Sequence, residues 1–137
     1  MSYMIILDTS FVVSYKIEDD TNHRKAVELM KEIAEGKYGE VIISDYIFDE
    51  AVTVILVRSK SLSLAVETGN DLRKYANIDK IGSDILDSAW EVFSDQKDTK
   101  FSFTDCTILS MMERKKIVHI ATFDAEFRKM KSIIVVS

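Results

Sequence analysis

The sequence predicts an α/β fold in which a central parallel sheet is covered by helices on both faces. Short apolar runs rich in branched residues recur at 4–7, 41–43, 117–121 and 133–136, and such runs are typical of buried parallel strands. Segments with apolar residues at helical spacing separate these runs, which is the alternation that produces a parallel sheet. At 137 residues the chain has the length of one ordinary domain, so we expect 1–137 to fold as a single unit.

The first half of the chain begins with the buried strand at 4–7. Residues 8–10 follow with Asp, Thr and Ser side chains, which are suited to capping a helix that continues through the apolar residues after them. A second helix is expected from about 22 to 35, where apolar residues recur every three or four positions, and Gly36 is a suitable residue to end it. The next buried strand is 41–43.

The remaining elements follow from the same two patterns. Gly69 lies in the middle of one helical segment, where glycine is tolerated but less favourable than other residues. In chain order we expect helices at 45–58 and 61–76, a short edge strand at 79–81, a helix capped by Ser83 or Asp84, a helix opened by Asp105, a strand at 117–121, a helical turn near 126–130 and a strand at 133–136.

Composition excludes several classes of protein. No apolar run approaches the roughly 18 residues that cross a membrane, and the N-terminal run lacks the basic flank and cleavage site of a signal peptide. One cysteine and two histidines exclude an internal disulfide and a zinc cage of Cys and His, and they suit the cytoplasm, where we expect the protein to be. The net charge of −5 argues against a general nucleic-acid coat, although four candidate site carboxylates account for most of it.

Those four carboxylates fall where the predicted fold would gather them. Asp8 closes the first strand, Asp124 follows the strand at 117–121, and Asp105 opens the helix before that strand. Glu50 lies one to two turns into the helix after the second strand, where it can lean over the same sheet edge. Ligands bind at the carboxyl ends of parallel strands, and hard carboxylate oxygens that would otherwise repel one another favour Mg²⁺ or Mn²⁺. The pattern predicts a divalent metal site.

Each acid also has a simpler explanation. Asp8, Asp105 and Asp124 could each cap a helix by accepting hydrogen bonds from backbone N–H groups, and Glu50 could lie on a solvated helix face. Spacing alone does not decide between these explanations. The combination of all four at the expected sheet edge is what favours the metal site.

Four motifs that contain these acids follow one another along the chain. They are Ile-Leu-Asp-Thr-Ser at 6–10, Ile-Ser-Asp-Tyr-Ile-Phe-Asp-Glu at 43–50, Phe-Thr-Asp-Cys at 103–106 and Ala-Thr-Phe-Asp-Ala-Glu-Phe at 121–127. In order and spacing they resemble the motifs of the PIN-domain family, and the similarity is closest to the VapC-like toxin ribonucleases. The resemblance covers nearly the whole chain.

The resemblance implies a parallel sheet in the order 3-2-1-4-5 and a metal-dependent endoribonuclease, which hydrolyses RNA phosphodiester bonds. It also implies the toxin of a type II toxin–antitoxin pair, a homodimer neutralised by a small antitoxin protein. The family's catalytic, metal-binding acids are matched by Asp8, Glu50, Asp105 and Asp124. Supporting polar positions are matched by Thr9, Ser10, Thr104 and Thr122, and Glu126 stands where many relatives carry an aspartate.

Basic and apolar side chains other than the four candidate acids have two explanations each. The basic ones could hold RNA phosphates beside the site or belong to a solvated face; they are Arg58, Lys60, Arg128 and Lys129. The apolar ones could line a dimer interface or a groove for a partner helix, or pack in the core; they are Tyr46, Phe48, Leu56, Leu62 and Leu64. Trp90 and Cys106 are expected in the core.

Other functional classes fit less well or remain open. A phosphatase of the haloacid dehalogenase type needs a second aspartate two residues after Asp8, where this chain has Ser10. A receiver-like signalling domain needs an early acidic pair and a late lysine, which this chain lacks. The remaining alternative is a PIN-like module that binds RNA or protein without cleaving it.

Overall fold

The computed structural model describes residues 3–137, in which strands alternate with helices along the chain. Their bounds agree with the sequence-based expectation to within a few residues. The elements are β1 (Met4–Leu7), α1 (Thr9–Lys16), α2 (His23–Ala34), β2 (Glu40–Ser44), α3 (Asp45–Ser59), α4 (Leu62–Tyr75), β3 (Asn77–Asp79), α5 (Ser83–Ser94), α6 (Phe103–Lys115), β4 (His119–Ala121), the 3-10 helix η1 (Ala125–Lys129) and β5 (Ile134–Val136).

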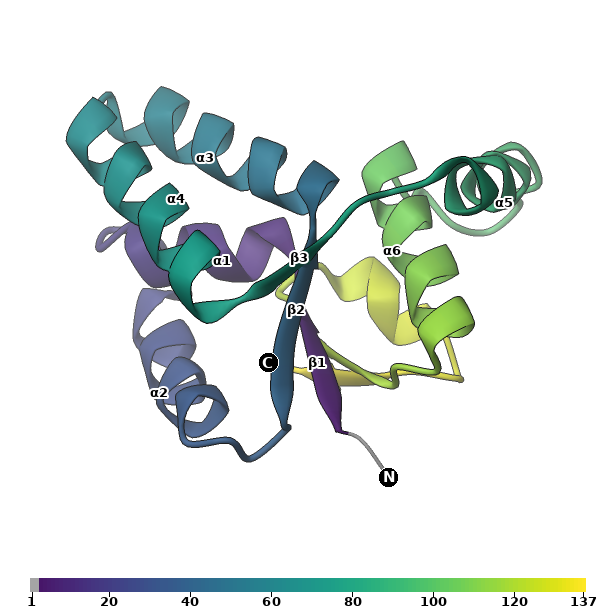
Figure 1. Cartoon of the computed structure of the whole chain (residues 1–137), viewed down its shortest axis with the longest axis horizontal. Coiled ribbons are helices and arrows are strands. Elements are labelled where there is room, and N and C mark those ends of the chain that lie inside the picture. Colours follow the sequence, from purple (N-terminus) through teal and green to yellow (C-terminus); the bar gives the residue numbers. More distant parts are fainter. Residues whose placement is uncertain (1–2) are drawn as a thin grey trace.

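The strands form one five-stranded parallel sheet in the order β3-β2-β1-β4-β5, which confirms the predicted fold class and strand order. β1 is central, and its Ile5 lies opposite Val41 of β2 and His119 of β4. Helices α1 to α4 lie on one side of the sheet, and α5 and α6 lie on the other (Figure 1). Because all strands are parallel, their carboxyl ends meet at one edge of the sheet.

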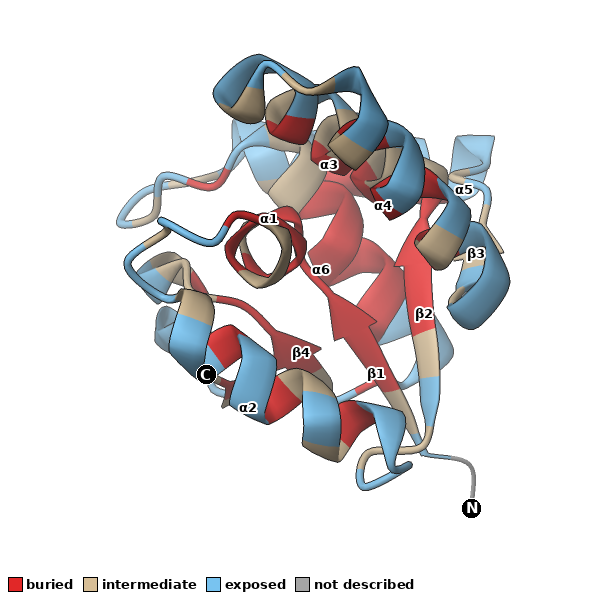
Figure 2. Cartoon of the chain, turned by 90° about the vertical axis from the view of Figure 1, so that its left-hand side faces the viewer, coloured by how far each residue is buried: buried red, intermediate tan, exposed pale blue. Residues whose placement is uncertain are grey.

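The core lies on both faces of the central strands. Ile5, Ile6, Ile43 and Ile120 are fully buried, as expected for parallel strands with helices on both sides. Helix α6 is buried at every position from 106 to 112 and is red almost throughout in Figure 2, together with β1 and β4. The N-terminus of α6 is therefore held in place by a long buried segment.

Two helix starts differ from the expectation. Helix α6 begins at Phe103 with Ser102 as its N-cap, so Asp105 is the third residue of the helix and does not open it. Helix α5 has Gly82 at its N-cap position, so neither Ser83 nor Asp84 is the cap.

Strand β3 and Trp90 also differ from the expectation. β3 spans Asn77–Asp79 and ends before Ile81, because the backbone N–H of Ile81 donates to Oδ1 of Asp45 at 2.9 Å instead of joining the ladder. Trp90 is not a core residue, since 59% of it is exposed. Cys106, in contrast, is fully buried as expected.

The turn into β2 requires glycine at position 39. Gly39 has a φ of +83°, and a Cβ placed there would overlap Tyr3, whose carbonyl oxygen accepts a hydrogen bond from the N–H of Glu40 at 3.1 Å. This close approach sets β2 beside β1.

Within residues 3–137, no helix has the length and apolar character needed to cross a bilayer.

Candidate functional site

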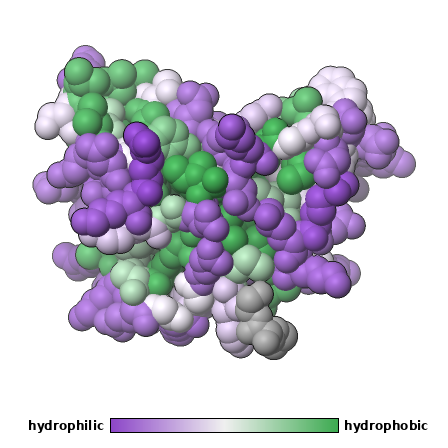
Figure 3. Space-filling view, viewed as in Figure 1, coloured by the Kyte–Doolittle hydropathy of each residue, from purple (hydrophilic) through white to green (hydrophobic). Residues whose placement is uncertain are grey.

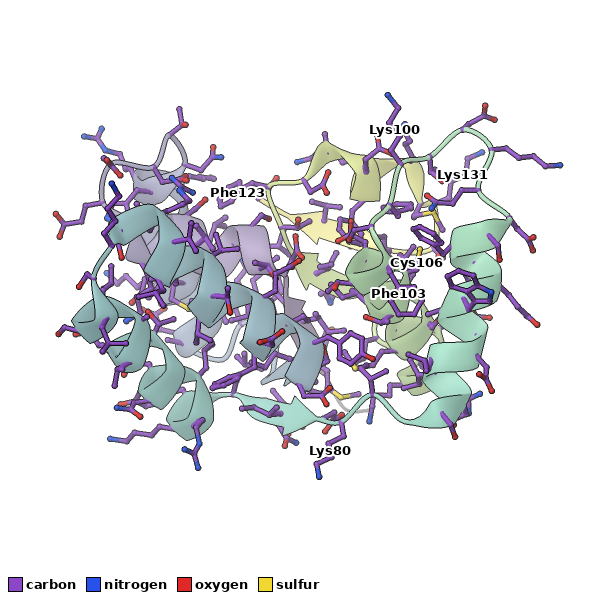
Figure 4. All side chains as sticks on the ribbon, turned by 90° about the horizontal axis from the view of Figure 1, so that it is seen from above. Lys80, Lys100, Phe103, Cys106, Phe123 and Lys131 are labelled. Atoms are coloured by element: carbon purple, nitrogen blue, oxygen red, sulfur yellow. The ribbon has the colours of Figure 1, made fainter. Side chains whose placement is uncertain are left out.

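A pocket of about 460 Å³ opens at the carboxyl ends of β1 and β4, on the face of the molecule seen in Figure 4. Its walls come from α1, the loop between α1 and α2, α3, the N-terminus of α6 and the segment after β4. All four acids predicted from the sequence line it: Asp8, Glu50, Asp105 and Asp124. The structure therefore brings together side chains that are far apart in sequence.

Asp8 is the most constrained of the four. Its backbone N–H donates to the carbonyl oxygen of Ala121 at 3.0 Å, and the residue is only 4% exposed. Oδ2 of Asp8 accepts hydrogen bonds from the hydroxyls of Thr122 at 2.7 Å and Ser10 at 2.9 Å. Asp8 stands at the N-cap position of α1, but its side chain makes no capping hydrogen bond. The helix-cap explanation is therefore wrong for Asp8.

The same two hydroxyls tie Asp8 to Asp124. The N–H of Asp124 donates to Oγ1 of Thr122 at 3.0 Å, and the N–H of Phe123 donates to Oγ of Ser10 at 3.0 Å. Asp124 also accepts a hydrogen bond from the N–H of Glu126 at 3.0 Å and so caps η1. Each hydroxyl thus donates to Asp8 and accepts from the backbone near Asp124, which fixes the two acids relative to each other.

Asp105 is positioned by a capping box at the start of α6. Oγ of Ser102 accepts from the N–H of Asp105 at 3.1 Å, and Oδ2 of Asp105 accepts from the N–H of Ser102 at 3.0 Å. Capping and a role in the pocket are compatible here, because a carboxylate has further acceptor positions besides the one that the cap uses.

The acids affect one another's ionisation. Burial raises the pKa of Asp8, against the lowering effect of the hydrogen bonds from Thr122 and Ser10. Burial, together with the charges of Asp8 and Asp124, raises the pKa of Asp105 to about 6. Among the described side chains that line the pocket, Arg58 alone is cationic, and it is paired with Asp20 at 3.1 Å. The pocket carries excess negative charge.

The chemical type of these donors suits a hard divalent cation, although their spacing in this structure does not yet enclose one. In this structure, no three Asp, Glu, His or Cys side chains of residues 3–137 are close enough together to hold one ion between them. The pocket nevertheless offers carboxylates without any Cys or His, as Mg²⁺ and Mn²⁺ prefer. Oγ1 of Thr9 is buried beside them without a hydrogen-bond partner, so it is a polar atom for which a ligand could provide a partner.

The supporting polar residues are distributed around and beyond this pocket. Thr9 and Ser10 line it, and Thr122 lies buried behind Asp8. Thr104 lines a second hollow of about 540 Å³, which shares Glu50 with the first pocket. Glu126 is not brought to the pocket.

The carboxylate of Glu126 has other partners. It accepts a hydrogen bond from the N–H of Lys100 at 2.9 Å and pairs with Nζ of Lys129 at 2.8 Å. These contacts hold the loop before α6 against η1. The structure gives Glu126 a role in fixing that loop, and its sequence position beside Asp124 does not reveal this.

Of the four basic candidates, only Arg58 reaches the pocket. Lys60 ends α3 in the left-handed conformation, with a φ of 57°. Arg128 donates to the Ser137 hydroxyl, and Lys129 is engaged by Glu126 and by the carbonyl oxygen of Asp98.

Four polar residues that line the pocket were not predicted from the sequence: Ser14, Asp20, Asn22 and Ser102. Ser102 could have been found, because Ser102 and Asp105 stand at the spacing of a capping box. Asp20 and Asn22 lie in the loop between α1 and α2, and loop residues show no periodicity from which their position could be predicted.

The fold corresponds to a known class. The model of the PIN-domain family matches residues 5–133, so the chain belongs to the PIN-domain family. The resemblance found in the sequence is thereby confirmed.

Particular relatives are similar over most of their length. The chain is 27% identical over 127 residues to a VapC ribonuclease of Archaeoglobus fulgidus, which covers 89% of this chain and 78% of that protein. The crystal structure of VapC20 of Mycobacterium tuberculosis, a sarcin–ricin loop cleaving toxin, superimposes with a TM-score of 0.82 at 25% identity, covering 91% of this chain and 93% of that one. VapBC2 of Rickettsia felis, at 16% identity, coverage of 97% of both chains and a TM-score of 0.70, shares the fold.

Proposed function

We propose that this protein is a divalent-metal-dependent endoribonuclease, with residues 1–137 acting as one nuclease domain, and that it is the toxin of a type II toxin–antitoxin pair. The observation that carries the proposal is the pocket at the carboxyl ends of β1 and β4, which is lined by the four candidate acids, by Asp20 and by one arginine, Arg58. Relatives named as a VapC ribonuclease and as a sarcin–ricin loop cleaving toxin support it.

Asp8, Asp105 and Asp124 are the proposed ligands of Mg²⁺ or Mn²⁺. Glu50, at the border of the two hollows, would complete the ligand set or orient the attacking water. When bound, the ion would neutralise phosphate charge and lower the pKa of a water molecule.

The surrounding side chains have supporting roles in this proposal. Ser10 and Thr122 hold Asp8 in one orientation through hydrogen bonds of 2.9 and 2.7 Å. Arg58 offers a guanidinium to the phosphate, and its contact with Asp20 holds the loop between α1 and α2 at the pocket edge.

Cleavage of a mixed pool of structured and single-stranded RNA tests the activity. The purified protein is incubated with Mn²⁺, Mg²⁺ or EDTA, beside Asp8→Asn, Asp105→Asn and the exposed control Asp95→Asn. We expect cleavage with either metal, none with EDTA, and loss in the first two variants only. RNA binding without cleavage by the wild-type protein would indicate the alternative, a non-catalytic PIN-like RNA- or protein-binding module.

We also propose a homodimer and a small antitoxin as partners. Five apolar residues could line an interface or pack in the core. Phe48 and Leu64 pack on the core and Tyr46 lines the second hollow, while Leu56 and Leu62 stay 40% and 66% exposed. Hydrophobic side chains gather where α3 ends and α4 begins (Figure 3). Light scattering of the wild-type protein and Leu62→Glu tests the dimer: a mass of two chains that falls to one in the variant is expected.

A further inference from the structure

Three aromatic side chains meet on the surface where α5 packs on α6. The rings of Trp90 and Phe93 are stacked, with centroids 5.7 Å apart and planes 23° apart, and Phe103 lies 6.1 Å from each. Helix α5 buries Ile85 and Ala89, which leaves Trp90 on its outer side, 59% exposed. We call these three residues the aromatic platform. An exposed cluster of this kind differs from a single scattered apolar side chain.

The aromatic platform and the proposed nuclease site share the N-terminus of α6. Phe103 stands between Ser102, which lines the carboxylate pocket, and Thr104, which lines the second hollow. In Figure 4, which looks onto the face where the pocket opens, Phe103 lies between α6 and α5. The N-terminus of α6 therefore contributes residues both to the two hollows and to the platform.

We propose that the aromatic platform stacks an unpaired nucleobase that flanks the scissile phosphate. This inference rests on the proposed function, because it names the part of the RNA that binds beside the site. Splayed bases of single-stranded RNA stack on exposed aromatic rings, and a platform of adjacent planar rings offers such a surface. The substrate class that follows is RNA with unpaired bases, such as a loop or a single strand.

The charges around the platform favour contact with a nucleobase over contact with a phosphate. Asp87 and Glu91 are exposed on the same helix beside Trp90, and they would repel a phosphate. Positive charge lies elsewhere, at Arg58 in the pocket and at Lys100 and Lys131, which Figure 4 shows at one edge of this face. The backbone would thus follow the basic side chains while a base contacts the rings.

A protein partner is the main alternative to RNA as the molecule that covers this surface. Leu86 lies one turn before Trp90 on α5 and is 37% exposed, so an apolar stripe of α5 could contact a second copy. The rings, however, gather around Phe103 at the N-terminus of α6, one turn of α5 away from Leu86. Three partly covered rings also offer little of the roughly 800 Å² that each partner of a stable complex buries.

Trp90 allows a direct test, because it is the single tryptophan of the chain. Full-length Asp8→Asn protein in EDTA is titrated with a mixed-sequence single-stranded oligoribonucleotide and with an abasic oligomer of the same length. We expect saturable quenching of the Trp90 fluorescence by the RNA and little by the abasic oligomer. By anisotropy of labelled RNA, Trp90→Ala should weaken binding about tenfold, Trp90→Phe much less, and the exposed control Tyr75→Ala not at all.

The possible results separate this inference from the proposed function. Equal quenching by both oligomers, or RNA binding that leaves Trp90 fluorescence and the Trp90→Ala affinity unchanged, would overturn the platform and leave the nuclease in place. A concentration-dependent shift of Trp90 emission without RNA would also overturn it, because a second copy would then cover the rings. Base-dependent quenching in a protein that does not cleave RNA with Mn²⁺ would support the platform and contradict the nuclease.

Discussion

The hydroxyl of Thr122 donates a 2.7 Å hydrogen bond to Oδ2 of Asp8, across 114 positions of the sequence. Asp8 follows β1 and Thr122 follows β4, and these strands are neighbours at the centre of the sheet. The same hydroxyl accepts the N–H of Asp124 at 3.0 Å. One small side chain therefore sets the relative positions of two acids of the pocket.

Replacing Thr122 tests this arrangement. Thr122→Val removes the hydroxyl and leaves the N–H of Asp124 without that acceptor, so we expect a loss of about 1–3 kcal/mol in the free energy of unfolding. Thr122→Ser keeps the hydroxyl and should lose less. Urea denaturation measures the difference. Equal stability of Thr122→Val and the wild-type protein would contradict the assigned role.

Asp105→Asn is expected to stabilise the metal-free protein near neutral pH. The pKa of Asp105 is raised from 3.8 to about 6 in the folded state, so the folded state binds this proton more tightly than the unfolded state. The stabilisation that protonated Asp105 gives the folded state is fully present below about pH 4 and is lost as the pH rises through 6. Asparagine removes the charge and can still accept the N–H of Ser102.

The measurement for Asp105→Asn is thermal unfolding in EDTA at pH 5 and pH 7.5. Because the side chain is partly exposed, solvent screens part of the effect of its charge. We therefore expect the free energy of unfolding to rise by roughly 1–2 kcal/mol at pH 7.5 and by less at pH 5. Addition of Mn²⁺ should stabilise the wild-type protein more than the variant. A variant that is less stable than the wild-type protein at pH 7.5 would contradict the sign of the pKa shift.

Arg58→Ala should weaken RNA binding more than Lys60→Ala does. Arg58 lines the carboxylate pocket and is held by Asp20, whereas Lys60 only ends the same helix. Loss of one phosphate contact should raise KM about tenfold and reduce the salt dependence of RNA binding. Steady-state cleavage at two salt concentrations measures both. Equal effects of the two substitutions would show that Arg58 has no special position.

Gly39→Ala tests the fold independently of the site. Its φ of +83° and the overlap of a new Cβ with Tyr3 predict a loss of about 2 kcal/mol or more in the free energy of unfolding. Gly36 has a similar φ of +89° but open space around it, so Gly36→Ala should cost less. Chemical denaturation of both variants checks this, and the reverse order would contradict the close approach of Gly39 to Tyr3.

The sequence was sufficient to predict the sheet and the gathering of the four acids, because apolar runs locate strands and parallel strands end at one edge. Strand ends were less predictable. The shift of β3 depends on a hydrogen bond from Ile81 to Asp45, a tertiary contact without a local pattern.

The orientation of side chains was the other feature that the sequence did not predict. Trp90 was expected in the core because it follows the helical spacing of α5, yet α5 packs through Ile85 and Ala89 and leaves Trp90 outside. Glu126 was expected at the site from its position beside Asp124, but its carboxylate binds Lys100 and Lys129. Neither outcome depends on the residue type alone, since each is decided by the neighbouring element.

Titration of Mn²⁺ into the metal-free protein by isothermal calorimetry tests most directly whether the carboxylate pocket is a metal site. The wild-type protein, Asp8→Asn and the exposed control Asp95→Asn are compared at pH 7.5. We predict saturable binding by the wild-type protein and by Asp95→Asn, with affinity reduced at least tenfold in Asp8→Asn. Absence of Mn²⁺ binding by the wild-type protein, or binding that does not depend on Asp8, would contradict the metal site and the nuclease function built on it.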